Sequence, residues 1–423
     1  MLAACGLSSI DDLFSHIPGE LRLGRELEIP EGMSEMELVA EMRRLAGRNR
    51  HVDDLVCFAG GGAYDHYVPA VVWAMAGRSE LYTSYTPYQP ELSQGVLQSL
   101  FEYQSMMCAL TGLEVSNASL YDGPTALVEA VHMATGATGR GRVLVSGSVD
   151  PRYAETLRTY GAGEHFSVEV FSFPYGRGGL DLRGKDVAAV VVQHPDYYGL
   201  LEPAAELFRS AREARARAIQ IFDPMSLGIL APPAALGADI AVGEGQPLGN
   251  HLNYGGPYLG IIAARPQDLR RMPGRIVGET VDVQGWRGYV LTLQAREQHI
   301  RRERATSNIC TNQTLMAVAA TVYLAWLGPR GLEELGRQCL AKAHYAAERI
   351  SDLTGAELLF PGEFFKEFAV RVDRPARAQQ RLLEAGFLVG PPVGEEGLLV
   401  SVTERRTREE IDRLAKAFGE AIA

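Results

Sequence analysis

Two polar residues stand at the ends of neighbouring apolar segments near the middle of the chain. Asp223 follows the apolar run 219–222, and Gln246 follows a second run, 238–242, so that it lies 23 residues after Asp223. Apolar runs bounded by Gly and Pro are typical of buried strands, whose ends carry the functional side chains of an α/β sheet. The carboxylate could pair with a protonated ring nitrogen, whereas a glutamine amide cannot form an imine.

An acid at one strand end and a reactive group at the next is the layout of the aminotransferase-like fold, fold type I, that uses pyridoxal phosphate. There the acid pairs with the pyridinium nitrogen and a lysine forms the Schiff base. We therefore expect Gln246 to occupy the lysine position, which leaves no catalytic residue in this chain. We expect no cofactor to be bound here and interpret Asp223 as a vestige of a cofactor site. An ordinary α/β core without any cofactor remains the alternative on pattern alone.

The lysines support this interpretation. The chain has four: Lys185, Lys342, Lys366 and Lys416. Lys185 precedes a predicted strand, at the end away from any site. The other three fall in a C-terminal region whose pattern is helical and typical of a surface, and none follows an acid at a strand end.

The elements around Asp223 alternate between apolar strands and helices. Strands predicted at 143–145, 168–171, 187–192 and 219–222 are separated by helical segments, which indicates a mostly parallel, doubly wound α/β sheet. We expect a large pyridoxal-fold domain over residues 56–327 and a small α+β C-terminal domain over 328–423. Residues 1–55 read as a helical arm that packs on a neighbouring domain or subunit, or on its own chain.

One predicted helix begins near a turn of small residues. Asp122, Gly123, Pro124 and Thr125 open it, and its first N–H groups would point outward, as in the phosphate cup of the pyridoxal fold. Asp122 has the wrong charge for a phosphate neighbour. This favours the absence of a bound cofactor.

Three polar segments are candidates for a binding surface or for contact with a partner. They are the glycine-rich stretch 58–67, the segment 82–91 with three tyrosines and two prolines, and the hydrogen-bonding stretch 306–313. Rigid loops that carry aromatic and polar side chains suit binding surfaces. For the stretch 58–67 the spacing alone slightly favours the alternative, a tight turn with buried aromatic side chains. The residues singled out are Tyr64, His66, Tyr85, Tyr88, Gln89, Ser307 and Asn308.

Composition limits the possible functions. The net charge of −11 gives no support to a nucleic-acid partner. No apolar run approaches the roughly 20 residues of a membrane helix, and the N-terminus lacks a signal-peptide pattern. The five cysteines are scattered without CxxC, as in a reduced, cytoplasmic protein. The nine histidines form no motif of metal ligands, so no metal site is expected.

Several long segments resemble the P-protein of the glycine cleavage system, glycine dehydrogenase (decarboxylating). They are Gly61–Pro69, Tyr85–Glu91, Tyr121–Ala126 and Arg301–Gln313, and the resemblance extends from about Leu7 to the C-terminus. The family includes single long chains with two related halves, and split forms in which each half is a separate subunit. The length here is similar to that of one subunit of the split form.

The resemblance implies a specific role. Aligning the turn at Gly255–Pro257 with that of the catalytic half places Gln246 at the lysine position, so the chain looks like the alpha subunit. Pyridoxal phosphate would be bound by the partner beta subunit, which decarboxylates glycine and passes the aminomethyl group to the lipoyl H-protein. Two alternatives are a regulatory or scaffolding pseudoenzyme and a stand-alone pyridoxal enzyme without a Schiff-base lysine.

Overall fold

The computed structural model describes residues 1–82, 86–163, 166–172, 180, 182 and 186–423. These residues divide into two compact units, Met1–His51 and Val52–Ala423.

The N-terminal unit consists of three short 3-10 turns and one helix, and none of the residues in these elements is buried. Helix α1 (Glu35–Ala46) begins at Ser34, whose hydroxyl accepts a hydrogen bond from the Glu37 amide. The Glu37 carboxylate accepts in return from the Ser34 amide, which completes a capping box. The 3-10 turns are η1 (Leu2–Cys5), η2 (Asp11–Phe14) and η3 (Gly19–Leu21).

The larger unit contains a seven-stranded sheet in the order β2-β8-β7-β6-β5-β3-β4. Strands β7, β6, β5, β3 and β4 run parallel, β8 pairs with β7 in the antiparallel sense, and β2 pairs with β8 in the antiparallel sense at the same edge. The expected α/β architecture with a mostly parallel sheet is therefore confirmed. The strands are β2 (Val115–Ser116), β3 (Arg142–Ser146), β4 (Ser167–Phe171), β5 (Ala189–Gln193), β6 (Arg217–Phe222), β7 (Ile240–Glu244) and β8 (Gly260–Ala264).

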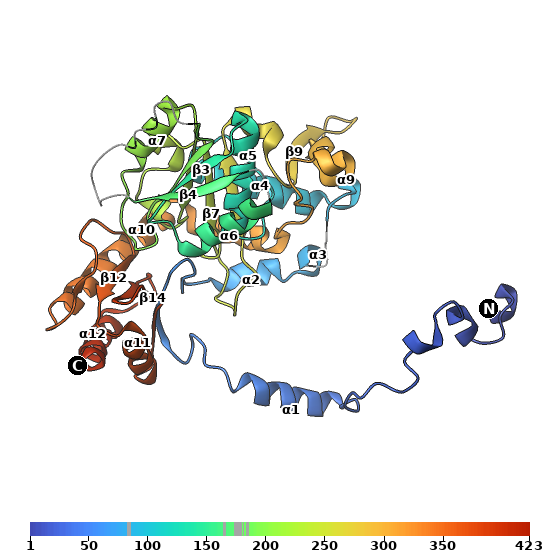
Figure 1. Cartoon of the computed structure of the whole chain (residues 1–423), viewed down its shortest axis with the longest axis horizontal. Helices are drawn as coiled ribbons and strands as arrows, with labels where there is room; N and C mark the ends of the chain where they lie inside the picture. The colour runs from blue at the N-terminus through green and yellow to red at the C-terminus, as the bar shows by residue number, and fades with distance from the viewer. Residues whose placement is uncertain (83–85, 164–165, 173–179, 181, 183–185) are drawn as a thin grey trace. The chain divides into compact units, whose positions relative to one another are not determined.

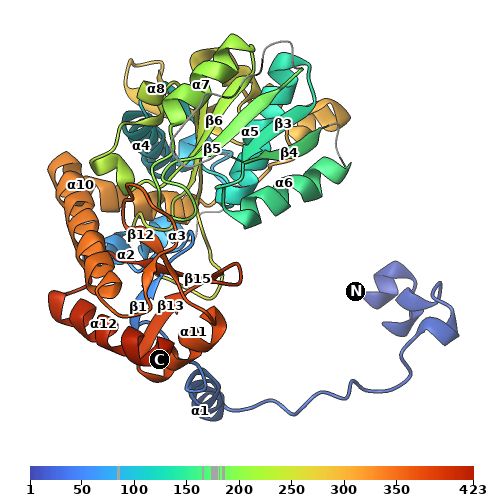
Figure 2. The ribbon, with the colours of Figure 1, turned by 60° about the vertical axis from the view of Figure 1, so that its left-hand side comes forward.

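Helices cover both faces of this sheet (Figures 1 and 2). Alternate residues of a strand point to opposite faces, so Ile219 and Ile221 pack with helix α5 (Gly123–Thr138) and α6 (Pro151–Gly163). On the other face, Ala218 packs with α7 (Ala204–Glu213). Phe222 and Ala241 pack with α4 (Gln94–Thr111) and with the first part of α10. The central strands are buried on both faces, which explains their continuous apolar runs.

A second, antiparallel sheet in the order β11-β12-β15-β14 lies in the C-terminal part of the unit. Strand β1 (Val56–Ala59) pairs in parallel with β13 (Phe387–Gly390), so the first strand of the chain joins these C-terminal elements. In Figure 2 they lie together below the large sheet. The elements are β11 (Glu357–Leu358), β12 (Glu367–Arg371), α11 (Pro375–Glu384), β14 (Pro392–Val393), β15 (Gly397–Ser401) and α12 (Arg408–Ile422).

Helix α10 (Thr314–Ser351) connects the two sheets (Figure 2). Its backbone leaves helical geometry at Gly328, next to Pro329, which cannot donate the hydrogen bond of a regular helix. By length and composition α10 is the one helix among the described residues that could cross a membrane, yet 44% of its most apolar 18-residue stretch is buried. Tyr323 and Cys339 lie in the core with α4, so α10 is packed as a core helix.

The remaining elements are short, apart from an antiparallel hairpin of β9 (Ile276–Val281) and β10 (Arg287–Thr292). The others are α2 (Ala70–Ala76), α3 (Ser79–Tyr82), η4 (Pro90–Leu92), η5 (Ser226–Gly228), α8 (Pro233–Leu236), η6 (Pro266–Arg271), η7 (Gln294–Arg296), α9 (Gln298–Arg301) and η8 (Arg302–Arg304).

Candidate functional site

Acidic side chains meet at the carboxyl ends of the parallel strands, where an α/β sheet places its ligands. Asp150 follows β3, Asp196 follows β5, Asp223 follows β6 and Glu244 ends β7. They line a cavity of about 50 Å³ together with side chains from the C-terminal sheet. This volume holds on the order of four water molecules. Its other lining residues include Tyr64, Tyr153, Gln193, Phe365, Lys366 and Glu367.

Gln246 holds the backbone of the glycine-rich segment. Its side-chain oxygen accepts from the Tyr64 amide at 2.9 Å, and its side-chain nitrogen donates to the Tyr64 carbonyl at 3.1 Å and to the Asn250 carbonyl at 2.8 Å. The Gln246 side chain thus pairs with both the backbone N–H and the backbone carbonyl of Tyr64. A lysine has no acceptor and could not make the first of these bonds.

Asp223 is paired with a lysine of its own chain. The Lys366 ammonium lies 2.7 Å from Asp223 Oδ2, and the lysine side chain is 2% exposed. Asp223 Oδ1 accepts from the Met225 amide, so both carboxylate oxygens are engaged. The expectation that Lys366 belongs to a surface-like region was wrong, because the C-terminal sheet packs this residue against the end of β6.

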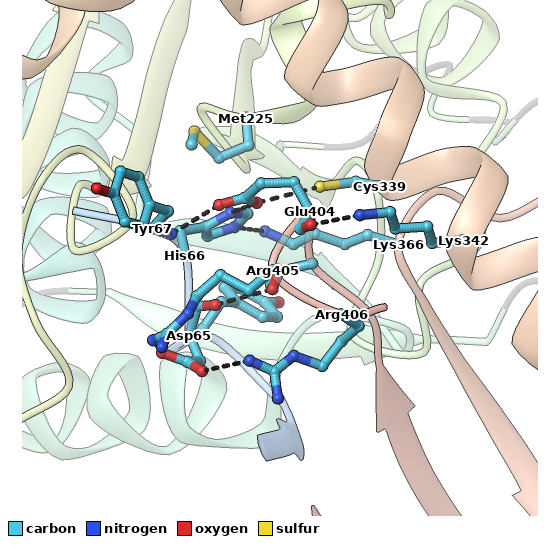
Figure 3. Close-up of polar contacts among 12 residues, drawn as sticks. Asp65, His66, Tyr67, Met225, Cys339, Lys342, Lys366, Glu404, Arg405 and Arg406 are labelled. Atoms are coloured by element: carbon cyan, nitrogen blue, oxygen red, sulfur yellow. Dashed lines mark hydrogen bonds and ion pairs between the residues drawn. The ribbon is translucent and has the colours of Figure 1, made fainter. Parts of the chain in front are cut away.

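The Lys366 ammonium has two further contacts. It donates to His66 Nε2 at 3.1 Å and lies 3.5 Å from the centre of the Tyr64 ring. Since an ammonium only donates, His66 Nε2 is the acceptor, and the imidazole proton is on Nδ1, directed at Glu404 Oε2 at 2.6 Å. Figure 3 shows this chain of side chains, with Lys366 and Glu404 on opposite edges of the imidazole.

Glu367 anchors the glycine-rich segment from the other side. Its carboxylate accepts from the Gly61 amide at 2.6 Å and from the Tyr64 hydroxyl at 2.9 Å. Lys366 and Glu367 therefore both contact Tyr64 of this segment, and Lys366 also reaches Asp223 of the large sheet. Burial raises the pKa of Tyr64, as do Glu367 and Asp223, and the hydroxyl therefore keeps its proton and donates it to Glu367.

The N-terminus of α5 is satisfied by carboxyl groups of this chain. Asp122 is the N-cap and accepts from the Thr125 amide at 2.8 Å. Glu244 accepts from the Gly123 amide at 3.0 Å, and from the amides of Gln246 and Leu259 at 2.9 Å each. The N–H groups that could cradle a phosphate are thus already bonded.

Three acids at this edge hold their protons to unusually high pH. Burial raises the pKa of Asp196 to about 8, that of Glu244 to about 8 and that of Glu367 to about 7. Hydrogen bonds from backbone amides oppose the shift in each case. Asp196 Oδ2 is buried and has no hydrogen-bond partner among the described residues.

The fold places the chain in the fold type I class, the aminotransferase-like architecture shared with the pyridoxal-phosphate enzymes. The alanine–glyoxylate aminotransferase of Nostoc matches with a TM-score of 0.62 at 18% identity, over 88% of this chain and 97% of the other. The sphingosine-1-phosphate lyase of Burkholderia pseudomallei matches with a TM-score of 0.68 at 16% identity, over 96% and 94%. At such identities the likeness establishes the fold alone.

The chain belongs to the glycine cleavage system P-protein family, whose profile matches residues 1–418. It is 53% identical to the probable glycine dehydrogenase (decarboxylating) subunit 1 of Moorella thermoacetica, over 99% of this chain and 96% of the relative. A crystal structure of glycine decarboxylase (P-protein) in inhibitor-bound form matches with a TM-score of 0.94 at 44% identity, over 100% and 97%. The family expected from the sequence is confirmed.

The residues at this edge do not fit pyridoxal phosphate. A cavity of about 50 Å³ is far below the roughly 300 Å³ at which small-molecule pockets begin. Gln246 cannot form an imine, Lys366 already neutralises Asp223, and Glu244 occupies the first N–H group of α5.

A cluster of His66, Cys339 and Glu404 has the residue types of a metal site, with ligand atoms within 4.8 Å of one another. The Cys339 thiol donates to Glu404, and burial and Glu404 raise the pKa of this thiol. His66 Nε2 faces the Lys366 ammonium. A protonated thiol and a fixed positive charge both oppose a cation, so the cluster is better described as a hydrogen-bonded network.

The residues singled out from the sequence occupy different environments. His66 is 4% exposed, and its imidazole and Tyr64 contribute to the Lys366 network. Tyr88 is 53% exposed, and its hydroxyl accepts from Arg275. Gln89 and Asn308 are exposed and Ser307 is half-buried, while Tyr85 lies outside the described residues.

Sequence reasoning missed four residues that organise this edge: Glu244, Lys366, Glu367 and Glu404. A usable signal was present for two of them. Lys366 and Glu367 form a charged pair between Phe365 and Phe368, inside an otherwise apolar stretch. Such a pair within an apolar run predicts buried charges with partners.

Proposed function

We propose that this chain is the non-catalytic subunit 1 of a two-subunit glycine dehydrogenase (decarboxylating), active only with its partner. The relatives named subunit 1 support the subunit role. The observation that carries the proposal is the state of Asp223: its partner is the buried Lys366, in a chain that has Gln246 in place of a Schiff-base lysine.

The partner, subunit 2, would bind pyridoxal phosphate and glycine. The complex would release carbon dioxide and pass the aminomethyl group to the lipoyl arm of an H-protein, which binds transiently. This chain would pack on subunit 2 and complete the surface around its active site. The occupied sheet edge supports this division, because it leaves no room in this chain for the cofactor.

The candidate residues for that surface are those selected from the sequence. Tyr88, Gln89 and Asn308 are exposed, so they can reach a neighbouring subunit directly. Ser307 is half-buried beside Asn308. Tyr64, His66 and Tyr85 complete the proposed set, and the contacts of His66 within its own chain suggest that it acts by positioning the segment around it.

The test is a visible absorption spectrum with pyridoxal phosphate, recorded for this chain alone and then with subunit 2. We expect no Schiff-base absorption from this chain alone, and glycine-dependent exchange of carbon dioxide only in the mixture. A borohydride-reducible Schiff base on this chain would overturn the proposal, since one of the four lysines would then serve.

Two other functions predict different results. A regulatory or scaffolding subunit would leave the decarboxylase activity of subunit 2 nearly unchanged when it is omitted. A stand-alone pyridoxal enzyme would bind the cofactor without subunit 2. We also propose a cytoplasmic location, since the free cysteines Cys5, Cys57, Cys108, Cys310 and Cys339 suit a reducing compartment.

A further inference from the structure

The environment of Lys366 is built for a cation. An ion buried without compensation costs several kcal/mol, so a buried ammonium needs partners on several sides. Here it has a carboxylate oxygen of Asp223 at 2.7 Å, the imidazole nitrogen of His66 at 3.1 Å and the face of the Tyr64 ring at 3.5 Å. A carboxylate, a lone pair and an aromatic face all attract positive charge.

The partners come from separate parts of the fold. Asp223 follows β6 of the large sheet, and Lys366 immediately precedes β12 of the C-terminal sheet. His66 and Tyr64 belong to the glycine-rich segment, which Gln246 and Glu367 hold by further hydrogen bonds. The ammonium is thus a point at which both sheets and this segment meet.

At the N-terminus of α5, groups of the chain itself also occupy the place of a ligand. The carboxyl oxygens of Glu244 accept from the Gly123 amide at the start of α5 and from two other amides. Tyr153 packs so closely that a Cβ atom on Gly123 would lie 1.9 Å from its hydroxyl. Acceptors from the chain itself therefore lie where a phosphate would bind a helix N-terminus.

We propose that Lys366 is an internal replacement for the ring nitrogen of the absent cofactor, and that its ion pair with Asp223 braces the two sheets without any ligand. A protonated ring nitrogen offers an acid one positive charge and one N–H donor, and the Lys366 ammonium supplies both from within the chain. Glu244 likewise supplies acceptors in place of phosphate oxygens. The brace deepens the proposed function, because it accounts for a subunit that keeps the fold without the cofactor.

The test is a double-mutant cycle measured by thermal unfolding of the full chain without subunit 2. Lys366→Met leaves the half-buried Asp223 without its cation, and Asp223→Asn leaves the buried ammonium without its anion. Each should lower Tm by on the order of 5 °C. The double variant should lose clearly less than the sum of the two, because neither charge is then left alone. Lys416→Met, at an exposed lysine, is the matched control and should change little.

Chemical rescue tests the position of the charge. Lys366→Ala removes the propylammonium portion of the side chain, so millimolar propylammonium should raise the Tm of this variant by a few degrees. Propanol and sodium chloride at the same concentrations should not. Three results would each overturn the brace. They are an equal rise of Tm with propylammonium, propanol and sodium chloride, additive losses of Tm in the double-mutant cycle, and a Lys366→Met variant as stable as the Lys416→Met control.

Failure of the brace and failure of the subunit role are distinguishable. The unfolding measurements use this chain alone, whereas the subunit role is judged by carbon dioxide exchange in the mixture. Additive losses with intact exchange would reject the brace only. If the double-mutant cycle is non-additive but subunit 2 exchanges carbon dioxide without this chain, the subunit role alone is rejected.

Discussion

Restoring a lysine at position 246 is the most direct perturbation of this site. In the present chain Gln246 is 1% exposed and makes three hydrogen bonds, two with Tyr64 and one with Asn250. Lysine cannot accept from the Tyr64 amide, and leaving that buried donor without a partner costs about 1–3 kcal/mol. Burying a second ammonium adds a few kcal/mol. We expect Gln246→Lys to destabilise the chain by about 3–5 kcal/mol.

The same variant should gain no cofactor. Asp223 remains paired with Lys366, and the cavity of about 50 Å³ cannot admit a pyridine ring with its phosphate. The assay is urea unfolding together with visible absorption on addition of pyridoxal phosphate. Gln246→Met is the matched control, because it removes the hydrogen bonds without adding charge and separates the two contributions to stability. A stable, yellow Gln246→Lys protein with a borohydride-reducible Schiff base would refute the reasoning.

Three further predictions concern pH, the proposed interface and a helix cap. Because burial raises the pKa of Asp196, Glu244 and Glu367, the folded chain holds protons that the unfolded chain releases near pH 4. Their stabilising effect is complete below that pH and is lost as the pH rises to about 8, so the free energy of unfolding in urea should fall between these two pH values. Asp196→Asn removes one of the three groups and should make this fall shallower by about 1.4 kcal/mol per pH unit. An unchanged dependence of the unfolding free energy on pH would contradict the raised pKa of Asp196. Tyr88→Ala should lower the kcat of the complex with subunit 2 roughly tenfold without dissociating it, as judged by gel filtration; unchanged kinetics would exclude this contact. Thr407→Ala removes the N-cap of α12 and should cost about 1 kcal/mol in urea unfolding, and no loss would mean that the cap contributes nothing.

Much of the fold could be predicted from the sequence, because helix caps and buried strands depend on residues that are close together in the chain. The capping boxes at Ser34 and Thr407 are local in this sense, because each joins residues three positions apart. The central strands were predicted from short apolar runs, since a parallel sheet covered on both faces needs apolar side chains at every position. The position of Asp223 at the end of β6 follows from the same rule.

The environment of Lys366 depended on the tertiary structure. Neighbouring residues do not reveal whether a lysine in the C-terminal region is buried, because its partners Asp223, His66 and Tyr64 are distant in sequence and meet it only when β12 packs against the large sheet. Glu244 is similar, since two of its three amide donors, Gly123 and Leu259, come from other segments of the chain.

The sequence by itself determined the fold class, the family and the absence of a lysine at position 246, because these depend on periodicity and on residue identity. The tertiary structure alone decided what occupies the site instead. Burial and pairing of charge are properties of atoms brought together from distant segments, and in this chain they place an ammonium on Asp223 and a carboxyl group on the N-terminus of α5.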